Sequence, residues 1–148
     1  MRKTALALLA GSALAGAVQA QELEVTMNAI TAEGVGEEIG TVLITQTPAG
    51  ARFVAELRGL PNGERGFHVH ANGDCGPGPN AQGEMAAGMA AGSHWDPDET
   101  KAHHGPEGEG HRGDLPVIFV QADGSAKGAV IAPRITDIGE LSGKALMI

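Results

Sequence analysis

The chain has 148 residues, 23 of them glycine, and a formal net charge of −8 at pH 7. This length suits one domain, and the acidic balance argues against nucleic acid or anionic lipid as partners, since both require basic patches. A small anionic substrate is not excluded, because the local field around a site matters more than the total charge.

The first twenty residues have the pattern of a cleaved secretory signal peptide. Arg2 and Lys3 form a basic head, an apolar stretch follows from Ala5 to Leu9, and Val18-Gln19-Ala20 provides a small–x–small cleavage site. A transmembrane anchor needs about 20 consecutive apolar residues, and this run is too short. We therefore expect a signal peptide over residues 1–20, no membrane anchor, and an exported domain over residues 21–148.

Alternation of apolar and polar residues predicts strands after this segment. It is visible over Leu23–Met27, Ile39–Thr45 and Arg52–Leu57, and we expect turns at Gly34–Gly36 and Pro48–Gly50. The hairpin-like spacing favours an all-β sandwich or barrel.

The segment from Gly73 to Gly113 is rich in Gly, Pro, Asp and His, and a loop of this length is unusual unless it has a function. Within it, Met85–Ala91 can form a short helical turn, which Gly88 and Gly92 limit. Bound metal would offset the entropy of ordering such a loop.

Strand character returns in the last part of the chain. It covers Pro116–Val120 and Gly128–Ala132, with an Asp123-Gly124 turn between them. Asp137–Leu141 is expected to form a short connecting turn, and Ala145–Ile148 is a final apolar run.

All six histidines lie between His68 and His111. His68 and His70 are two apart, so on a strand they share a face and can bind one metal ion. Alone, this pair would more often be exposed polar residues, but the rest of the cluster changes that interpretation. The further candidates are His94, His103, His104, His111 and Asp114.

The residue types in this cluster indicate zinc or copper. Neutral imidazole binds both metals, and a carboxylate oxygen can complete a tetrahedral zinc site. His111 and Asp114 are three apart across Gly113, so a tight turn can direct both side chains at one ion. From the residues alone, a generic zinc-binding loop remains an alternative.

The order of the motifs is more specific. HxH, then GxHxDP, then HxGP, then HxGD resembles the copper–zinc superoxide dismutase family in its bacterial periplasmic branch, from about Glu24 to the end of the chain. The resemblance implies a Greek-key β-sandwich or flattened barrel, copper and zinc as cofactors, a periplasmic location, and superoxide as the substrate. The reaction implied is disproportionation of superoxide to dioxygen and hydrogen peroxide.

The resemblance also implies a role for each candidate residue. His68, His70 and His94 correspond to copper ligands, and His94 is also the catalytic imidazole that bridges copper to zinc. The zinc ligands would be His94, His103, His111 and Asp114. His103 is preferred to His104 because it stands three residues before Pro106, as the family motif requires.

The family pattern continues past Ile148. The fourth copper histidine, the final strand, a substrate-guiding arginine and the second cysteine of a disulfide would follow there. Cys75 occupies the position of the first disulfide cysteine and is the only cysteine. We therefore expect a C-terminally incomplete domain, in which Cys75 has no partner in the chain. The favoured explanation is a fragment of a normal enzyme, and the alternative is a real truncated product with impaired activity.

A non-catalytic copper- or zinc-binding periplasmic module is the alternative function. The HxH pair beside a bridging histidine favours the enzyme, because a zinc buffer has no need of a neighbouring copper site. The sequence leaves the oligomeric state open, with a homodimer among the alternatives.

Overall fold

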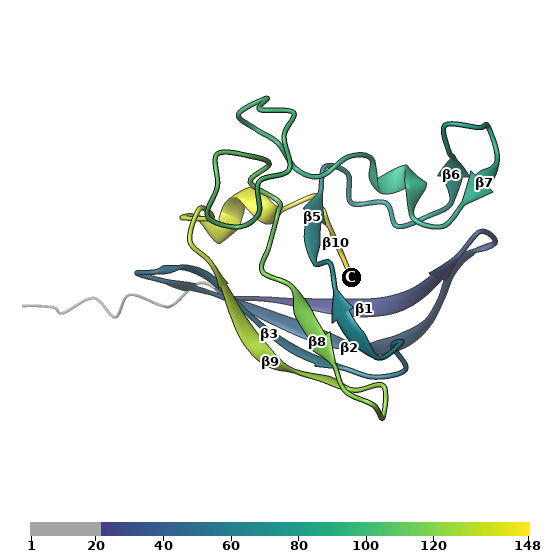
Figure 1. The fold of residues 1–148 in the computed structure, drawn as a ribbon, viewed down its shortest axis with the longest axis horizontal. Helices are drawn as coiled ribbons and strands as arrows, with labels where there is room; N and C mark the ends of the chain where they lie inside the picture. The colour runs from purple at the N-terminus through teal and green to yellow at the C-terminus, as the bar shows by residue number, and fades with distance from the viewer. Residues whose placement is uncertain (1–21) are drawn as a thin grey trace, which may run out of the picture.

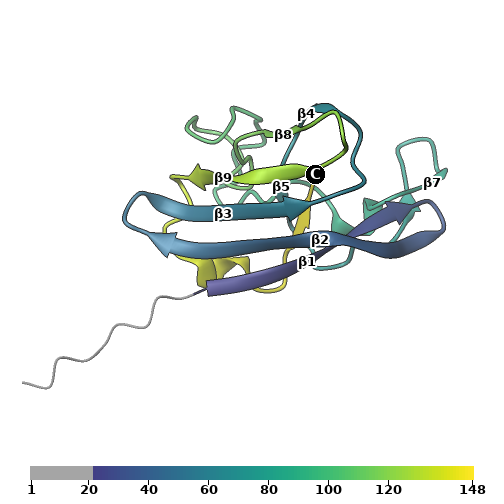
Figure 2. The same cartoon turned by 90° about the horizontal axis from the view of Figure 1, so that it is seen from below.

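The main sheet has four antiparallel strands. In a computed structural model that describes residues 22–148, they are β1 (Glu22–Thr31), β2 (Gly34–Thr47), β3 (Gly50–Leu57) and β9 (Ala126–Ala132). Their order is β1-β2-β3-β9, and Figures 1 and 2 show the long strands β1, β2 and β3 side by side. The predicted signal peptide lies outside the described residues.

Shorter elements lie over one face of this sheet (Figure 1). The pairs are β5 (His68–His70) with β10 (Ala145–Met147), β4 (Gly63–Arg65) with β8 (Ile118–Val120), and β6 (Gly78–Pro79) with β7 (Met85–Ala86). Two 3-10 turns complete the described elements, η1 (Met89–Ala91) and η2 (Ile138–Leu141). The loops between β5 and β8 gather beyond β5, on the side away from the main sheet.

The core forms between the main sheet and β5. Phe53 on β3 and Phe67, directly before β5, are fully buried and pack edge to face with ring centroids 5.7 Å apart. Val69 is also buried, whereas His68 and His70 on either side of it are only partly covered. Because neighbouring side chains on a strand alternate between faces, burial of Val69 directs both histidines toward the loops.

The predicted all-β class is confirmed, and the three predicted N-terminal strands lie within β1, β2 and β3. The predicted turn at Gly34–Gly36 is wrong, because β2 already begins at Gly34 and pairs with the end of β1. The turn lies at Ala32-Glu33, directly before the predicted range. In residues 22–148 we find no helix long and apolar enough to span a membrane.

Candidate metal centre

The histidine pair on β5 meets two loop segments through backbone hydrogen bonds. The Val69 N–H donates to the carbonyl of Gly113 at 2.9 Å, and the Val69 carbonyl accepts from the Trp95 N–H at 2.8 Å. β10 pairs with the other edge of β5. This arrangement places His70 opposite His94 and His68 opposite Asp114, so residues distant in sequence converge on one strand.

Gly113 is required for this close approach. A Cβ at this position would lie 2.2 Å from the carbonyl oxygen of Val69 and 2.9 Å from the backbone nitrogen of Trp95. Only glycine therefore allows the segment after His111 to bond to β5 with Asp114 turned inward. The glycine of the HxGD motif has a packing reason that the sequence alone does not reveal.

Three imidazoles converge on the Asp114 carboxylate. Its Oδ1 lies 2.9 Å from Nδ1 of His94, 2.9 Å from Nδ1 of His103 and 3.4 Å from Nδ1 of His111. Asp114 is 2% exposed, whereas the His103 side chain is 56% exposed. The cluster thus has a buried carboxylate at its base and an imidazole at the protein surface.

The arrangement fits a bound cation better than a set of hydrogen bonds. Asp114 Oδ2 and His111 Nδ1 are buried without a hydrogen-bond partner, and one carboxylate oxygen has too few lone pairs for three N–H donors. Tetrahedral zinc, with bonds of about 2.0–2.2 Å, separates its ligand atoms by about 3.3–3.6 Å. The three nitrogen–oxygen distances equal this separation or fall a few tenths of an ångström below it.

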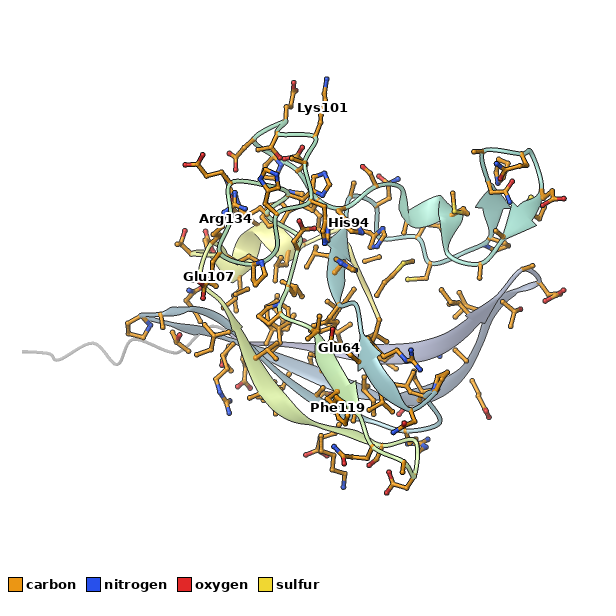
Figure 3. The ribbon with its side chains drawn as sticks, viewed as in Figure 1. Glu64, His94, Lys101, Glu107, Phe119 and Arg134 are labelled. Atoms are coloured by element: carbon orange, nitrogen blue, oxygen red, sulfur yellow. The ribbon has the colours of Figure 1, made fainter. Side chains whose placement is uncertain are left out.

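His94 is the histidine shared by two groups of rings. Its ring centroid is 4.0 Å from that of His68 and 5.0 Å from that of His70, and 5.3 Å from those of both His103 and His111. Figure 3 shows His94 between β5 and the loops above it. Its Nδ1 faces Asp114, which leaves Nε2 as the atom available to the His68 and His70 side.

His68 also offers a nitrogen within 4.8 Å of ligand atoms from His94, His103 and Asp114. The geometry therefore allows two sets of metal ligands around Asp114, one that includes His68 and one that includes His111. Direct contact favours His111, since its otherwise unpartnered Nδ1 lies next to Asp114 Oδ1, whereas the His68 ring stacks on His94.

The local environment favours the neutral form of the His68 and His94 imidazoles. Burial, followed by the neighbouring His94, lowers the pKa of His68 from 6.5 to about 4. Burial also lowers the pKa of His94, although its hydrogen bond to Asp114 opposes the shift. Nδ1 of His70 donates to the carbonyl of Gly92 at 2.8 Å, which leaves Nε2 as the ring nitrogen available to a metal. Neutral imidazole is the form that binds a metal.

The structure brings the sequence-predicted candidates His68, His70, His94, His103, His111 and Asp114 into one cluster. His104 is exposed and makes no contact with Asp114 among the described ion pairs. Cys75 is a free, half-buried cysteine that lines an apolar groove between β1 and β10, outside the cluster.

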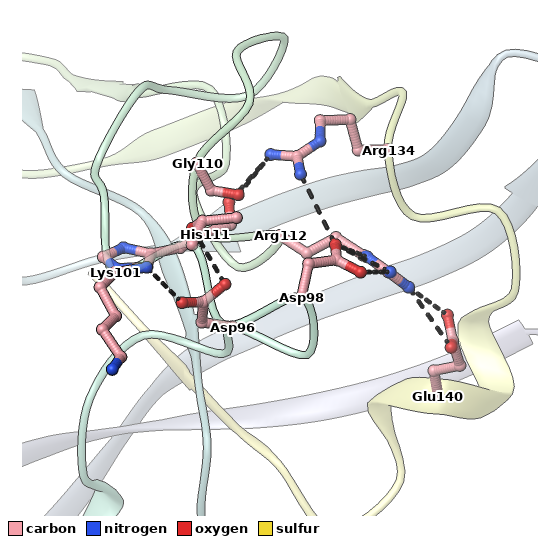
Figure 4. A network of polar contacts seen from close by, with 9 residues as sticks. Asp96, Asp98, Lys101, Gly110, His111, Arg112, Arg134 and Glu140 are labelled. Atoms are coloured by element: carbon pink, nitrogen blue, oxygen red, sulfur yellow. Dashed lines mark hydrogen bonds and ion pairs between the residues drawn. The ribbon is translucent and has the colours of Figure 1, made fainter.

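A charged network beside the cluster was not anticipated from the sequence. The Arg112 guanidinium binds both carboxylate oxygens of Asp98, at 2.8 and 2.9 Å (Figure 4). It also lies 5.4 Å from the centroid of the Trp95 ring. Arg134 and Glu140 join it from the chain after β9. No local motif relates Arg134 and Glu140 to this loop, because only the tertiary fold brings them together.

Comparison with known proteins agrees with this geometry. The family model for copper/zinc superoxide dismutase (SODC) matches residues 38–148. The Cu-Zn superoxide dismutase 2 of Salmonella typhimurium is 50% identical over 148 residues, which is 100% of this chain and 84% of the relative. The Cu-Zn superoxide dismutase of Escherichia coli K12 is 48% identical with the same coverage.

Solved structures give the same result. The Cu/Zn superoxide dismutase from Brucella abortus superposes with a TM-score of 0.83 at 40% identity, covering 86% of this chain and 82% of that one. The monomeric copper, zinc superoxide dismutase from Salmonella enterica gives a TM-score of 0.77 at 51% identity, with the same coverage. The sandwich predicted from the sequence is thus the fold of these enzymes, and the chain belongs to the copper/zinc superoxide dismutase family.

Proposed function

We propose that this cluster disproportionates superoxide, with His68, His70 and His94 as copper ligands and His94, His103, His111 and Asp114 as zinc ligands. The position of His94 carries the proposal. Its ring lies next to the rings of His68 and His70 on β5 and also next to those of His103 and His111 beside Asp114. The centroid distances are 4.0 to 5.3 Å. A protein that only stored zinc would have no use for the β5 pair on the far side of this ring.

When bound, copper supplies one-electron redox chemistry, so that one superoxide is oxidised to dioxygen and a second, with two protons, is reduced to hydrogen peroxide. The residues of the chain set the proton chemistry. Nδ1 of His94 faces Asp114 on the proposed zinc side, which leaves Nε2 as the nitrogen that can take up and release a proton. His94 is accordingly the proposed catalytic residue.

Substrate access is provided by a cavity of about 630 Å³ beside the cluster. His68, His94 and His103 line it, together with Glu64 and Pro106. A diatomic anion is far smaller than this cavity, so superoxide reaches the imidazoles without a conformational change. Glu64, labelled in Figure 3, adds an acidic side chain to the lining of this cavity.

The test is the decay of superoxide followed optically in stopped flow, with the full chain loaded with Cu²⁺ and Zn²⁺. We expect His70→Ala to lose copper and nearly all activity while keeping zinc. His104→Ala, a neighbouring exposed histidine outside the cluster, is the control and should behave like the wild-type chain. Undiminished activity of His70→Ala would reject the ligand assignment.

We also propose that residues 1–20 direct export to the periplasm and that residues 21–148 form the enzymatic domain. The basic head, apolar stretch and Ala20 cleavage site support this. Fractionation of expressing bacteria should place the activity in the periplasm, with Gln21 as the first residue. Retention of Met1 in an active periplasmic product would contradict the cleavage.

Two finer expectations concern association. The relative from Salmonella enterica is described as monomeric. Light scattering tests whether this chain forms a homodimer. A measured mass equal to that of one chain would reject the homodimer. Cys75 is the proposed disulfide position of the family, and it is free in the residues that the structure describes. A non-reducing gel of the exported protein tests this.

A further inference from the structure

Arg134 reaches from the main sheet to the loop that carries His111. It follows β9 by two residues, and its Nη1 donates to the carbonyl of Gly110 at 2.8 Å and to that of His111 at 3.3 Å (Figure 4). Its Nη2 lies 3.8 Å from Asp98 Oδ2, and its side chain is 24% exposed. One guanidinium therefore bonds the loop backbone and approaches a loop carboxylate.

These two carbonyls belong to the two peptide groups on either side of the His111 Cα. The first of these peptide groups also donates its N–H, that of His111, to the carbonyl of Ala102 at 2.7 Å. Each peptide group is planar, so holding the two peptide groups on either side of the His111 Cα also fixes the direction of its Cα–Cβ bond. The imidazole of His111 is thereby directed toward Asp114.

The loop needs such support because it has little regular structure of its own. Gly108, Gly110 and Gly113 flank His111, and glycine loses more conformational freedom on ordering than any other residue. No helix or strand covers residues 92–117. Contacts from outside the loop must therefore hold the ligand-bearing segment in place.

A second arginine, Arg112, holds Asp98, the carboxylate that Arg134 approaches. Arg112 binds Asp98 through both carboxylate oxygens and lies 3.4 Å from Glu140 on η2. Asp98 thus lies between two guanidinium groups, one from the loop and one from the chain after β9 (Figure 4). The network of Asp98, Arg112, Arg134 and Glu140 thus joins the loop to the chain after β9, and its ion pairs include none of the ligand atoms of the cluster.

We propose that Arg134 is a positioning residue for the zinc ligands, acting through the backbone of His111. The inference rests on the proposed assignment of His111 to zinc. Arg134 does not contact the metal, so its effect is on the geometry and affinity of the ligand set. Loss of groups that orient metal ligands typically costs about 10–100-fold in metal affinity.

The experiment measures Zn²⁺ and Co²⁺ affinity of the full chain by chelator competition, together with the visible spectrum of the Co²⁺ form. Arg134→Ala should bind about 10–100-fold more weakly and show a weakened or shifted tetrahedral Co²⁺ band. Arg134→Gln keeps one donor for the carbonyls and should fall between. Arg52→Ala, at an exposed position on β3, is the control and should match the wild-type chain.

Wild-type affinity and an unchanged Co²⁺ spectrum in Arg134→Ala would overturn the proposal. If that variant does not fold, Arg134→Gln decides the question, and unchanged metal binding in it has the same meaning. Failure of the proposed function is distinguishable, because a wild-type chain that binds zinc without disproportionating superoxide would leave the role of Arg134 intact. A wild-type chain that binds no metal would overturn both.

Discussion

Nδ1 of His94 lies 2.9 Å from Oδ1 of Asp114, and this contact joins a ring facing the β5 histidines to the buried base of the cluster. It determines which nitrogen of His94 serves each side. The carboxylate engages Nδ1, so Nε2 is left for the group formed with His68 and His70. The orientation of His94 thus depends on a residue twenty positions later in the chain.

Asp114→Asn removes the charge of this carboxylate and keeps its shape. We expect zinc affinity to fall by more than the roughly 100-fold associated with losing an orienting group, because a ligand itself is replaced. Chelator competition measures the loss. Asp123→Asn, in the turn between β8 and β9, is the matched control, and an equal affinity in both variants would show that Asp114 is not a ligand.

His103 and His104 provide a comparison between adjacent exposed residues. His103→Ala should weaken zinc binding at least about tenfold, because its Nδ1 is 2.9 Å from Asp114 Oδ1. His104→Ala should leave the affinity unchanged. Calorimetric titration of each variant with Zn²⁺ separates the two, and the reverse result would exchange their roles.

The metal-free protein should lose stability as the solution becomes acidic. The pKa of His68 falls from 6.5 to about 4 on folding, first because of burial and then because of His94. Between these values the unfolded chain binds a proton that the folded chain does not, so the free energy of unfolding decreases as pH falls through this window. The lowered pKa of His94 acts in the same direction.

Urea denaturation of the metal-free chain at several pH values between about 7 and 4 measures this effect. In His68→Gln the decrease should be smaller, because one of the groups responsible is absent. If the wild-type chain and the variant show the same pH dependence, His68 does not contribute to it.

Gly113→Ala tests the packing requirement beside β5. The added Cβ would lie 2.2 Å from the Val69 carbonyl oxygen, so we expect a loss of about 1–3 kcal/mol in the free energy of unfolding. Gly128→Ala on β9 is the control, since nothing lies within 4 Å of the added atom, and a change below about 1 kcal/mol is expected. Urea midpoints of the metal-free variants compare them, and equal midpoints would contradict the account.

The sequence was most informative where the signal is local. The alternation around Val42, Ile44 and Phe53 predicts strands because period two is a property of the backbone itself. Likewise, Val69 between His68 and His70 predicts two imidazoles on the face opposite the core. The order of the histidine motifs identified the family, and the family comparison bears this out.

Contacts between distant segments could not be predicted in this way. The turn expected at Gly34–Gly36 lies instead at Ala32-Glu33, because Gly34 and Val35 pair with Thr31 and Ile30 at the end of β1. The bonds from Arg134 to Gly110 and His111 depend on where the chain after β9 meets the loop. Neither arises from a spacing that can be read along the sequence.

The central claim is that one imidazole, that of His94, serves two metal ions. It is tested most directly by placing Co²⁺ at the proposed zinc position and Cu²⁺ at the proposed copper position, then recording the electron paramagnetic resonance of copper. The account predicts that the Cu²⁺ signal of the metal-loaded chain weakens strongly on Co²⁺ binding, because an imidazolate bridge couples the two spins. A full-intensity, unperturbed Cu²⁺ signal with both metals bound in stoichiometric amounts would contradict it.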